Sequence, residues 1–306
     1  PGWWDGLVGP GRPLDTDRMF IVCPNVLGGC QGTTGPASVA PDGRPWGSRW
    51  PDITIGDQVR VEAALADALG IATWAGVVGG SMGGMRALEW AVGYPDRVRT
   101  AVLLACGPVA TAEQIALYST HLAAIRLDPH WAGGDYHSAP AGRGPSAGLA
   151  LAREIAQIGY RSERELASRF GATIRAQERP TGNPEHRYEV VSYLEHHGEK
   201  LVRRFDAGTY VTLTAAMMDQ DIGRGRGGVA EALRTCPVPV AVGAVDSDRL
   251  YPPYLQRGMA ELFGVELDVL SSLYGHDGFL LELDAVGAIV RRALGAVLGA
   301  PASSAP

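Results

Sequence analysis

Short apolar runs alternate with stretches of helical periodicity in the first part of the chain. Apolar runs at residues 19–23, 74–78 and 99–106 predict strands, and periodic stretches at 54–70 and 85–91 predict helices. The run at 99–106 is apolar throughout, which is typical of a strand buried on both faces. Parallel strands joined by helices through short connections predict an α/β fold with a doubly wound, mostly parallel sheet.

The pattern changes after residue 108, where helical periodicity continues to about residue 221 with almost no strand signal. Predicted helices lie at 112–125, 146–158, 162–169 and 189–205. Strands at 237–245 and 265–270, with helices at 252–263 and 285–298, then resume the first pattern. Because the α/β pattern resumes after the helical block, we interpret the block as an insertion rather than as a separate helical domain. Insertions of this kind often form a lid over a site. We therefore expect a core at 1–107, a helical lid at 108–225 and a second core part at 226–306.

Composition narrows the functional class. The 306 residues are 46% apolar with a net charge of −6, so no electrostatic argument favours nucleic acid or an anionic membrane as a partner. No apolar run reaches membrane-spanning length, and the N-terminus lacks a signal-peptide pattern. Cys23, Cys30, Cys106 and Cys236 are scattered without metal-ligand spacing. We expect four small buried cysteines, no metal and a cytoplasmic location.

The sequence Gly79-Gly80-Ser81-Met82-Gly83 matches G-x-S-x-G between an apolar run and a helix-forming run. In such a turn the serine occupies strained backbone, and we expect that a side chain at Gly79 or Gly83 would collide. The following helix directs its N-terminus at the hydroxyl. A glycine-rich turn with an incidental serine is the alternative, but the strand–turn–helix context favours a nucleophile at Ser81.

A serine nucleophile needs a base, and the base needs an acid that orients it. In α/β sheets with a serine elbow, these groups follow later strands in the order Ser, Asp, His. His276 follows the predicted strand at 265–270, whereas the other six histidines fall in the helical block. Asp246 and Asp248 both follow the strand at 237–245, and the residues alone do not decide which of them orients His276.

Several longer motifs carry a resemblance to a known family. They are Pro1 to Trp4, Cys23 to Pro36, Gly79 to Met85, Ala124-Ile125 with Asp128-Pro129 and Gly133-Gly134-Asp135-Tyr136, Ser247 to Pro252, and Tyr274 to Leu280. With these motifs the chain resembles the homoserine O-acetyltransferase family, which belongs to the α/β-hydrolase superfold. The resemblance implies that Ser81 is the nucleophile, His276 the general base and Asp248, rather than Asp246, the acid. The backbone N–H of Met82 is the expected oxyanion donor.

The resemblance also assigns substrate-binding residues. It implies that Arg153 and Tyr160 help hold the amino-acid substrate and that Asp277 binds its amine. Homoserine is a zwitterion, so a cation for its carboxylate and an anion for its amine fit these roles. Without the resemblance, we would expect Arg153 to be an exposed helix arginine paired with a neighbour such as Glu154. The corresponding alternative for Asp277 is a turn-forming aspartate before a glycine.

One departure from the family pattern concerns the start of the chain. Family members begin with strands before the position of Pro1, and a leucine-threonine-glycine turn there supplies a second oxyanion donor. We expect an N-terminally shortened chain, and losing one donor typically lowers turnover by about 10²–10³.

The predicted function is transfer of an acetyl group from acetyl-CoA to L-homoserine by a ping-pong mechanism in methionine biosynthesis. The resemblance implies acetyl-CoA as co-substrate, no permanently bound cofactor and a homodimer. Alternatives are a succinyl-CoA donor, serine or a secondary-metabolite alcohol as acceptor, an esterase on the same triad, and a non-enzymatic remnant.

Overall fold

The computed structural model describes residues 2–140, 142–174 and 188–299, and the chain divides into two compact units. The sheet unit comprises Pro1–Pro24, Ile55–Val109 and Gln220–Pro306, and the helical unit comprises Asn25–Thr54 and Ala110–Asp219. The segment 25–54, which we placed in the first core part, thus groups with the helical block.

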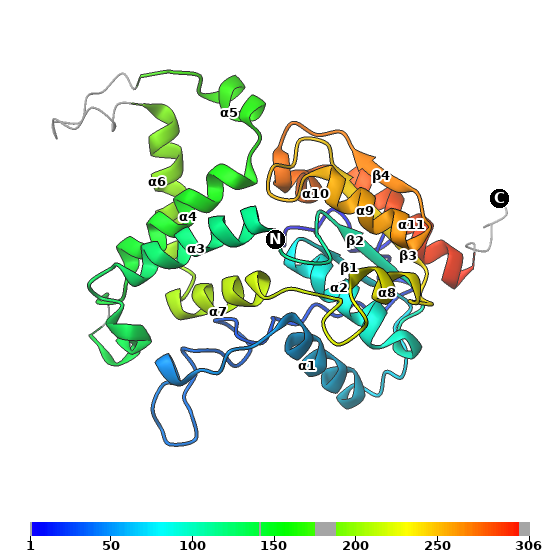
Figure 1. Ribbon diagram of the computed structural model, residues 1–306, viewed down its shortest axis with the longest axis horizontal. Helices are drawn as coiled ribbons and strands as arrows, with labels where there is room; N and C mark the ends of the chain where they lie inside the picture. Colours follow the sequence, from blue (N-terminus) through cyan, green and yellow to red (C-terminus); the bar gives the residue numbers. More distant parts are fainter. Residues whose placement is uncertain (1, 141, 175–187, 300–306) are drawn as a thin grey trace. The chain divides into compact units, whose positions relative to one another are not determined.

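The sheet unit is built on four parallel strands in the order β1-β2-β3-β4 (Figure 1). They are β1 (Val77–Gly80), β2 (Ala101–Leu104), β3 (Val240–Val245) and β4 (Leu267–Leu270). Every residue of β2 is buried, as the unbroken apolar run predicted. The predicted α/β fold with a parallel sheet is confirmed.

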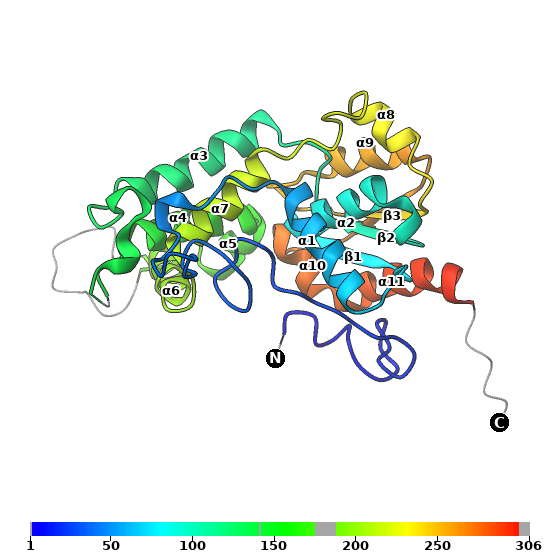
Figure 2. The same cartoon turned by 90° about the horizontal axis from the view of Figure 1, so that it is seen from below.

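Helices cover both faces of this sheet (Figure 2). They are α1 (Ile55–Ala68), α2 (Met82–Gly93), α8 (Val229–Arg234), α9 (Pro253–Phe263), α10 (Gly278–Leu281) and α11 (Leu283–Leu298), with 3₁₀ turns η2 (Pro95–Arg97) and η6 (Gly275–Asp277). α11 packs on one face, where Val286 and Val290 join Val102, Leu104 and Leu7 in a buried cluster. α2 and α9 pack on the other face.

The predicted strand at residues 19–23 is wrong. These residues form no strand in the described part of the chain. A strand exists only through pairing, and this run instead contributes side chains, because Met19 and Ile21 pack against the cluster under α11 while Phe20 is exposed.

The helical unit contains α3 (Ala112–Arg126), α4 (Ser146–Tyr160), α5 (Glu163–Arg169), α6 (Glu189–Val202) and α7 (Ala207–Met218). Its 3₁₀ turns are η1 (Gly47–Arg49), η3 (Ala132–Gly134) and η4 (Tyr136–Ser138). The sequence pattern did not predict α7, whose first turns mix glycine with β-branched residues. Asp206 caps it, since its carboxylate accepts a hydrogen bond of 2.7 Å from the N–H of Thr209.

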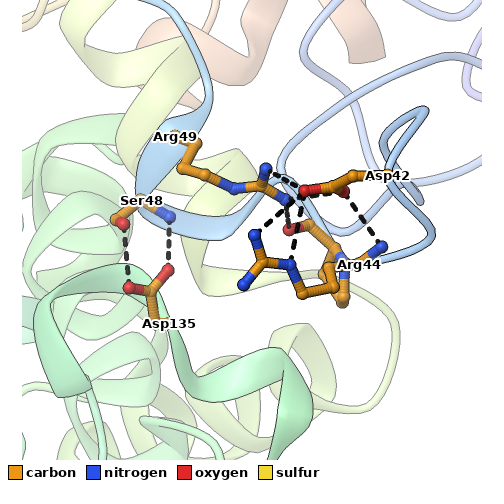
Figure 3. A network of polar contacts seen from close by, with 6 residues as sticks. Asp42, Arg44, Ser48, Arg49 and Asp135 are labelled. Carbon is orange, nitrogen blue, oxygen red and sulfur yellow. Dashed lines mark hydrogen bonds and ion pairs between the residues drawn. The ribbon is translucent and has the colours of Figure 1, made fainter.

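The segment 25–54 is tied to the helices by specific contacts. The N–H and the Oγ of Ser48 each donate to the carboxylate of Asp135 at 2.9 Å (Figure 3). The Nε2 of Gln31 donates to the carbonyl of Arg204 at 3.4 Å. These bonds explain why a long, glycine-rich segment is ordered without strands or long helices.

Among the described residues, no helix is long and apolar enough to cross a membrane. All four cysteines are free thiols, but only Cys106 is buried. Burial raises the pKa of its thiol to about 12. The expectation of four buried cysteines is wrong, because Cys23 is exposed and Cys30 and Cys236 are partly buried.

Candidate active site

Ser81 occupies the turn between β1 and α2. Its backbone has φ 54° and ψ −124°, a conformation that residues other than glycine rarely adopt. The N–H of Ser81 donates to the carbonyl of Leu104 at 2.9 Å, so the turn stays joined to the neighbouring strand. The strained turn therefore places the serine at the carboxyl end of β1 and the N-terminus of α2, as the motif predicted.

The glycines of the turn have different steric roles. A Cβ at Gly79 would lie 2.0 Å from the carbonyl oxygen of Gly83, which no side chain tolerates. A Cβ at Gly83 would meet no atom within 4 Å beyond its own helix, so the predicted collision there is wrong. A Cβ at Gly80 would lie 2.4 Å from the ring of Phe279. Gly79 and Gly80 allow the close approaches that the turn needs.

His276 and Asp248 form a buried pair within the sheet unit. The Nδ1 of His276 lies 2.7 Å from Oδ2 of Asp248, and the two residues are 3% and 4% exposed. The other carboxylate oxygen of Asp248 accepts hydrogen bonds from the N–H groups of Leu250 (2.8 Å) and Tyr251 (2.9 Å). Because the carboxylate accepts at Nδ1, that nitrogen carries the proton, which leaves Nε2 as the basic nitrogen.

Asp246 has a different environment. It is exposed, and its carboxylate accepts from the N–H of Ser272 at 2.9 Å and the Oγ of Ser271 at 3.1 Å. Between the two aspartates, the Oγ of Ser247 donates to the carbonyl of Ser272 at 2.6 Å. The loop after β3 is thus joined to the loop that carries His276, and Asp248 is the aspartate that reaches the imidazole.

The charge balance at His276 favours the imidazolium. Burial lowers the pKa of His276, but the carboxylate of Asp248, through its charge and its hydrogen bond, and the charge of Asp277 outweigh burial and raise that pKa above its ordinary value of 6.5. A raised pKa makes the neutral ring a stronger base, which suits removal of a proton from a hydroxyl.

Two aromatic residues that we did not assign to the site contact His276. The ring of Tyr251, which is fully buried, lies 5.3 Å from the imidazole centroid, and the ring of Phe279 lies edge-on at the same distance. Phe279 also packs on Gly80, the residue before Ser81, so one ring contacts both the serine turn and the histidine. Both residues fall in the motifs quoted above, and membership of these motifs was the sequence signal that could have assigned them to the site.

The remaining predicted site residues fall in both units. Met82 is the first residue of α2, where an N–H has no helical carbonyl to bond, and Asp277 follows His276 in η6.

Arg153 and Tyr160 lie on α4 of the helical unit, with the guanidinium carbon of Arg153 5.0 Å from the Tyr160 ring centroid. The alternative for Arg153, an exposed helix arginine paired with a neighbour such as Glu154, differs from the structure, in which Arg153 is partly buried and its guanidinium lies over the Tyr160 ring. In the part of the chain that the structure describes, no group of three or more histidine, cysteine or acidic residues is placed to hold a metal.

A serine on a strand–helix turn and a histidine–aspartate pair after later parallel strands define the α/β-hydrolase class. The α/β hydrolase fold family matches residues 1–283, so the chain belongs to this fold. Within it, the chain belongs to the homoserine O-acetyltransferase family. The prediction of an enzyme of this family is confirmed.

One homoserine O-acetyltransferase, from Mycobacterium sp. (strain KMS), is 60% identical over 96% of this chain and 78% of its own length. A homoserine O-acetyltransferase structure from Bacillus anthracis is 27% identical with a TM-score of 0.86, covering 96% of this chain and 81% of that one. Esterase E22 is 26% identical with a TM-score of 0.86, covering 96% and 83%. The fold thus occurs in a transferase and in an esterase.

Proposed function

We propose that this protein transfers an acetyl group from acetyl-CoA to the hydroxyl of L-homoserine. The observation that carries the proposal is the 60% identity to a relative named homoserine O-acetyltransferase, over 96% of the chain. The pairing of His276 with Asp248 supports a general base for acyl transfer.

In the first half-reaction, the Oγ of Ser81 attacks the thioester carbonyl while Nε2 of His276 accepts the hydroxyl proton. The N–H of Met82 donates to the oxyanion, which lowers the energy of the tetrahedral intermediate. The C–S bond then breaks, the proton moves from His276 to the departing sulfur, and an acetyl ester remains on Ser81.

In the second half-reaction, the homoserine hydroxyl attacks the ester carbon and its proton passes to His276. The bond from the acetyl carbon to Ser81 breaks, and Oγ takes the proton back. Asp248 holds the imidazole in one tautomer through both halves and stabilises the imidazolium. We assign Arg153 and Tyr160 to the homoserine carboxylate and Asp277 to its amine, which matches the opposite charges of the zwitterion.

An acyl-CoA by alcohol matrix tests the proposal. Acetyl-CoA with homoserine should give the highest kcat/KM, above succinyl-CoA and above serine as acceptor. Ser81→Ala should abolish both CoA release and ester formation. Release of CoA at the parental rate by that variant would refute the serine mechanism.

The match to an esterase gives a second candidate, hydrolysis on the same residues. The two reactions differ in what removes the acetyl group from Ser81. Without homoserine, a transferase releases CoA once per active site and then stops, whereas an esterase releases it continuously. Mass spectrometry of the halted enzyme should show one added acetyl group on the peptide that carries Ser81.

Family resemblance extends the proposal to a cytoplasmic homodimer that acts in methionine biosynthesis without a resident cofactor. Sedimentation velocity measures the oligomeric state. Growth of a methionine-requiring bacterial strain that lacks its own acyltransferase, with and without the gene, tests the pathway.

A further inference from the structure

The sequence motif that ends at Trp4 has no part in the chemistry proposed above, yet Trp4 is tied to the core of the sheet unit. Its carbonyl accepts hydrogen bonds from the N–H groups of Leu7 at 2.7 Å and Val8 at 3.1 Å. Leu7 is fully buried in the cluster under α11, and a Cβ at Gly6 would lie 2.4 Å from Leu283 at the start of α11. Close packing in the sheet unit therefore fixes the turn that carries Trp4.

The indole of Trp4 contacts the ring of Phe279. The two ring centroids lie 6.5 Å apart with planes at 86°, an edge-to-face geometry that aromatic pairs favour. Phe279 is 6% exposed, and its ring lies edge-on to the imidazole of His276, with centroids 5.3 Å apart and planes at 72°. The same ring fills the space at Gly80, where a Cβ would lie 2.4 Å from it. A continuous set of contacts thus joins Trp4 to the imidazole and to the turn that carries Ser81.

The backbone around His276 gives this side chain little support of its own. His276 lies in η6, which has three residues, and Phe279 lies in α10, which has four, and helices of this length are not stable by themselves. The hydrogen bond from Nδ1 to Asp248 holds one edge of the imidazole. The position of Nε2, at the opposite edge, also depends on the rings packed against the imidazole, those of Tyr251 and Phe279.

We propose that Trp4 and Phe279 are positioning residues, which hold the imidazole of His276 in a fixed place relative to the turn that carries Ser81. Neither side chain exchanges a proton with the reacting atoms, so both act only through the orientation of His276. The inference rests on the proposed function for the role of His276 as the base at Ser81. It gives the motif at the start of the chain a part in the rate of both half-reactions.

Replacement of Trp4 by leucine and by phenylalanine tests the proposal. Trp4→Leu keeps an apolar side chain but removes the ring. Because His276 serves both half-reactions, this variant should lower kcat about tenfold and keep both KM values within about twofold, as expected when a catalytic group is slightly displaced. Trp4→Phe keeps an aromatic edge and should keep kcat within about threefold of the parent. Trp3→Leu makes the same change one position earlier, at a 77% exposed indole, and should leave kcat unchanged.

Labelling with a fluorophosphonate separates positioning from folding. The reagent bonds to the Oγ of a reactive serine with loss of fluoride, so its final extent counts folded sites and its rate constant reports the base. Trp4→Leu should reach one label per chain with a rate constant about tenfold lower. Leu294→Ala removes a side chain from the same cluster beside Gly76, at the opposite end of β1. It should unfold at a lower urea concentration than the parent but keep the parental rate constant.

A double variant shows whether Trp4 acts through Phe279. Phe279→Leu should slow labelling at least as much as Trp4→Leu, and the double variant should be no slower than Phe279→Leu alone, because the effects of residues in contact do not add. Labelling of Trp4→Leu at the parental rate, a loss confined to its extent of labelling, or additive losses in the double variant would overturn the inference. Slowed labelling of Trp4→Leu, in a protein whose parent transfers acetyl from acetyl-CoA to no alcohol, would instead refute the proposed transfer and support the positioning role.

Discussion

Replacing Asp248 by asparagine separates the charge of this residue from its shape. The two carboxylate oxygens accept from three donors: Nδ1 of His276 at 2.7 Å and the N–H groups of Leu250 and Tyr251 at 2.8 and 2.9 Å. An asparagine can place its oxygen toward the two backbone donors, but its NH₂ group then faces Nδ1–H. Two N–H groups that face each other form no hydrogen bond. The imidazole must therefore move its proton to Nε2 or turn away.

The expected loss follows from this geometry. With the proton on Nε2, no basic nitrogen remains for the hydroxyl of Ser81, so we expect kcat to fall by about 10³–10⁴. The carboxylate charge also raises the pKa of His276, so the acid limb of the remaining kcat/KM profile should move to lower pH. The buried unpaired donor should lower the free energy of unfolding by about 1–3 kcal/mol.

Asp246→Asn is the matched control. It makes the same chemical change two positions earlier, at an exposed carboxylate that bonds Ser271 and Ser272 instead of the imidazole. Its kcat should stay within about twofold of the parent, because a surface hydrogen bond contributes little. The assay follows CoA release with a thiol reagent at saturating homoserine. Equal losses in the two variants, or a parental kcat for Asp248→Asn, would refute the assignment of the acid.

Four further results are expected. Gly79→Ala should lower the free energy of unfolding in urea by about 3 kcal/mol or more, since its Cβ would lie 2.0 Å from a backbone oxygen, whereas Gly83→Ala should unfold at nearly the parental urea concentration. Values of kcat/KM should fall as the pH drops through the raised pKa of His276, because the protonated ring is no base; an acid limb well below pH 6.5 would contradict this. Arg153→Lys should raise KM for homoserine about tenfold while the rate of acetyl-enzyme formation, measured by stopped flow, stays unchanged, and a slowed first half-reaction would count against a homoserine-specific role. Ser81→Gly and Ser81→Ala should both be inactive, but the glycine variant should be more stable to urea by about 1 kcal/mol, because only glycine relieves the positive φ; a more stable alanine variant would argue against strain.

Apolar runs predicted the sheet best at its centre, where every residue of β2 and the last four residues of β3 are buried. The strands β1 and β4 at the two sides are only partly buried. The run at 99–106 contains β2, yet the strand ends at Leu104 because Ala105 takes a φ of 47°. No apolar pattern signals a positive φ at alanine. The prediction of a strand at 19–23 failed because an apolar run does not reveal strand pairing. Side chains of this run pack on the core, but its backbone lacks a pairing partner among the described residues.

The order of the candidate site residues along the chain could be predicted from the sequence. The contacts between them could be predicted less well. Ser81, an acidic loop and His276 could be recognised because strands, turns and glycines frame them. The choice between Asp246 and Asp248 depends on how Ser247 joins two loops, which spacing alone does not reveal. Phe279 had no predicted role, because its contact with Gly80 arises only when the segments after β1 and β4 are folded together.

The strained turn explains why Ser81, the proposed nucleophile, lies where it does. Ser81 and Ala105 are both non-glycine residues with positive φ, and they follow β1 and β2 at neighbouring ends of the sheet. Each conformation costs about 1–2 kcal/mol and persists only if its surroundings leave no alternative. Here the N–H of Ser81 bonds Leu104, and the N–H of Ala105 bonds Gly243 on β3, both at 2.9 Å. The parallel hydrogen-bond pattern thus continues past the regular strands, and the buried sheet, rather than local preference, holds the serine in its strained position.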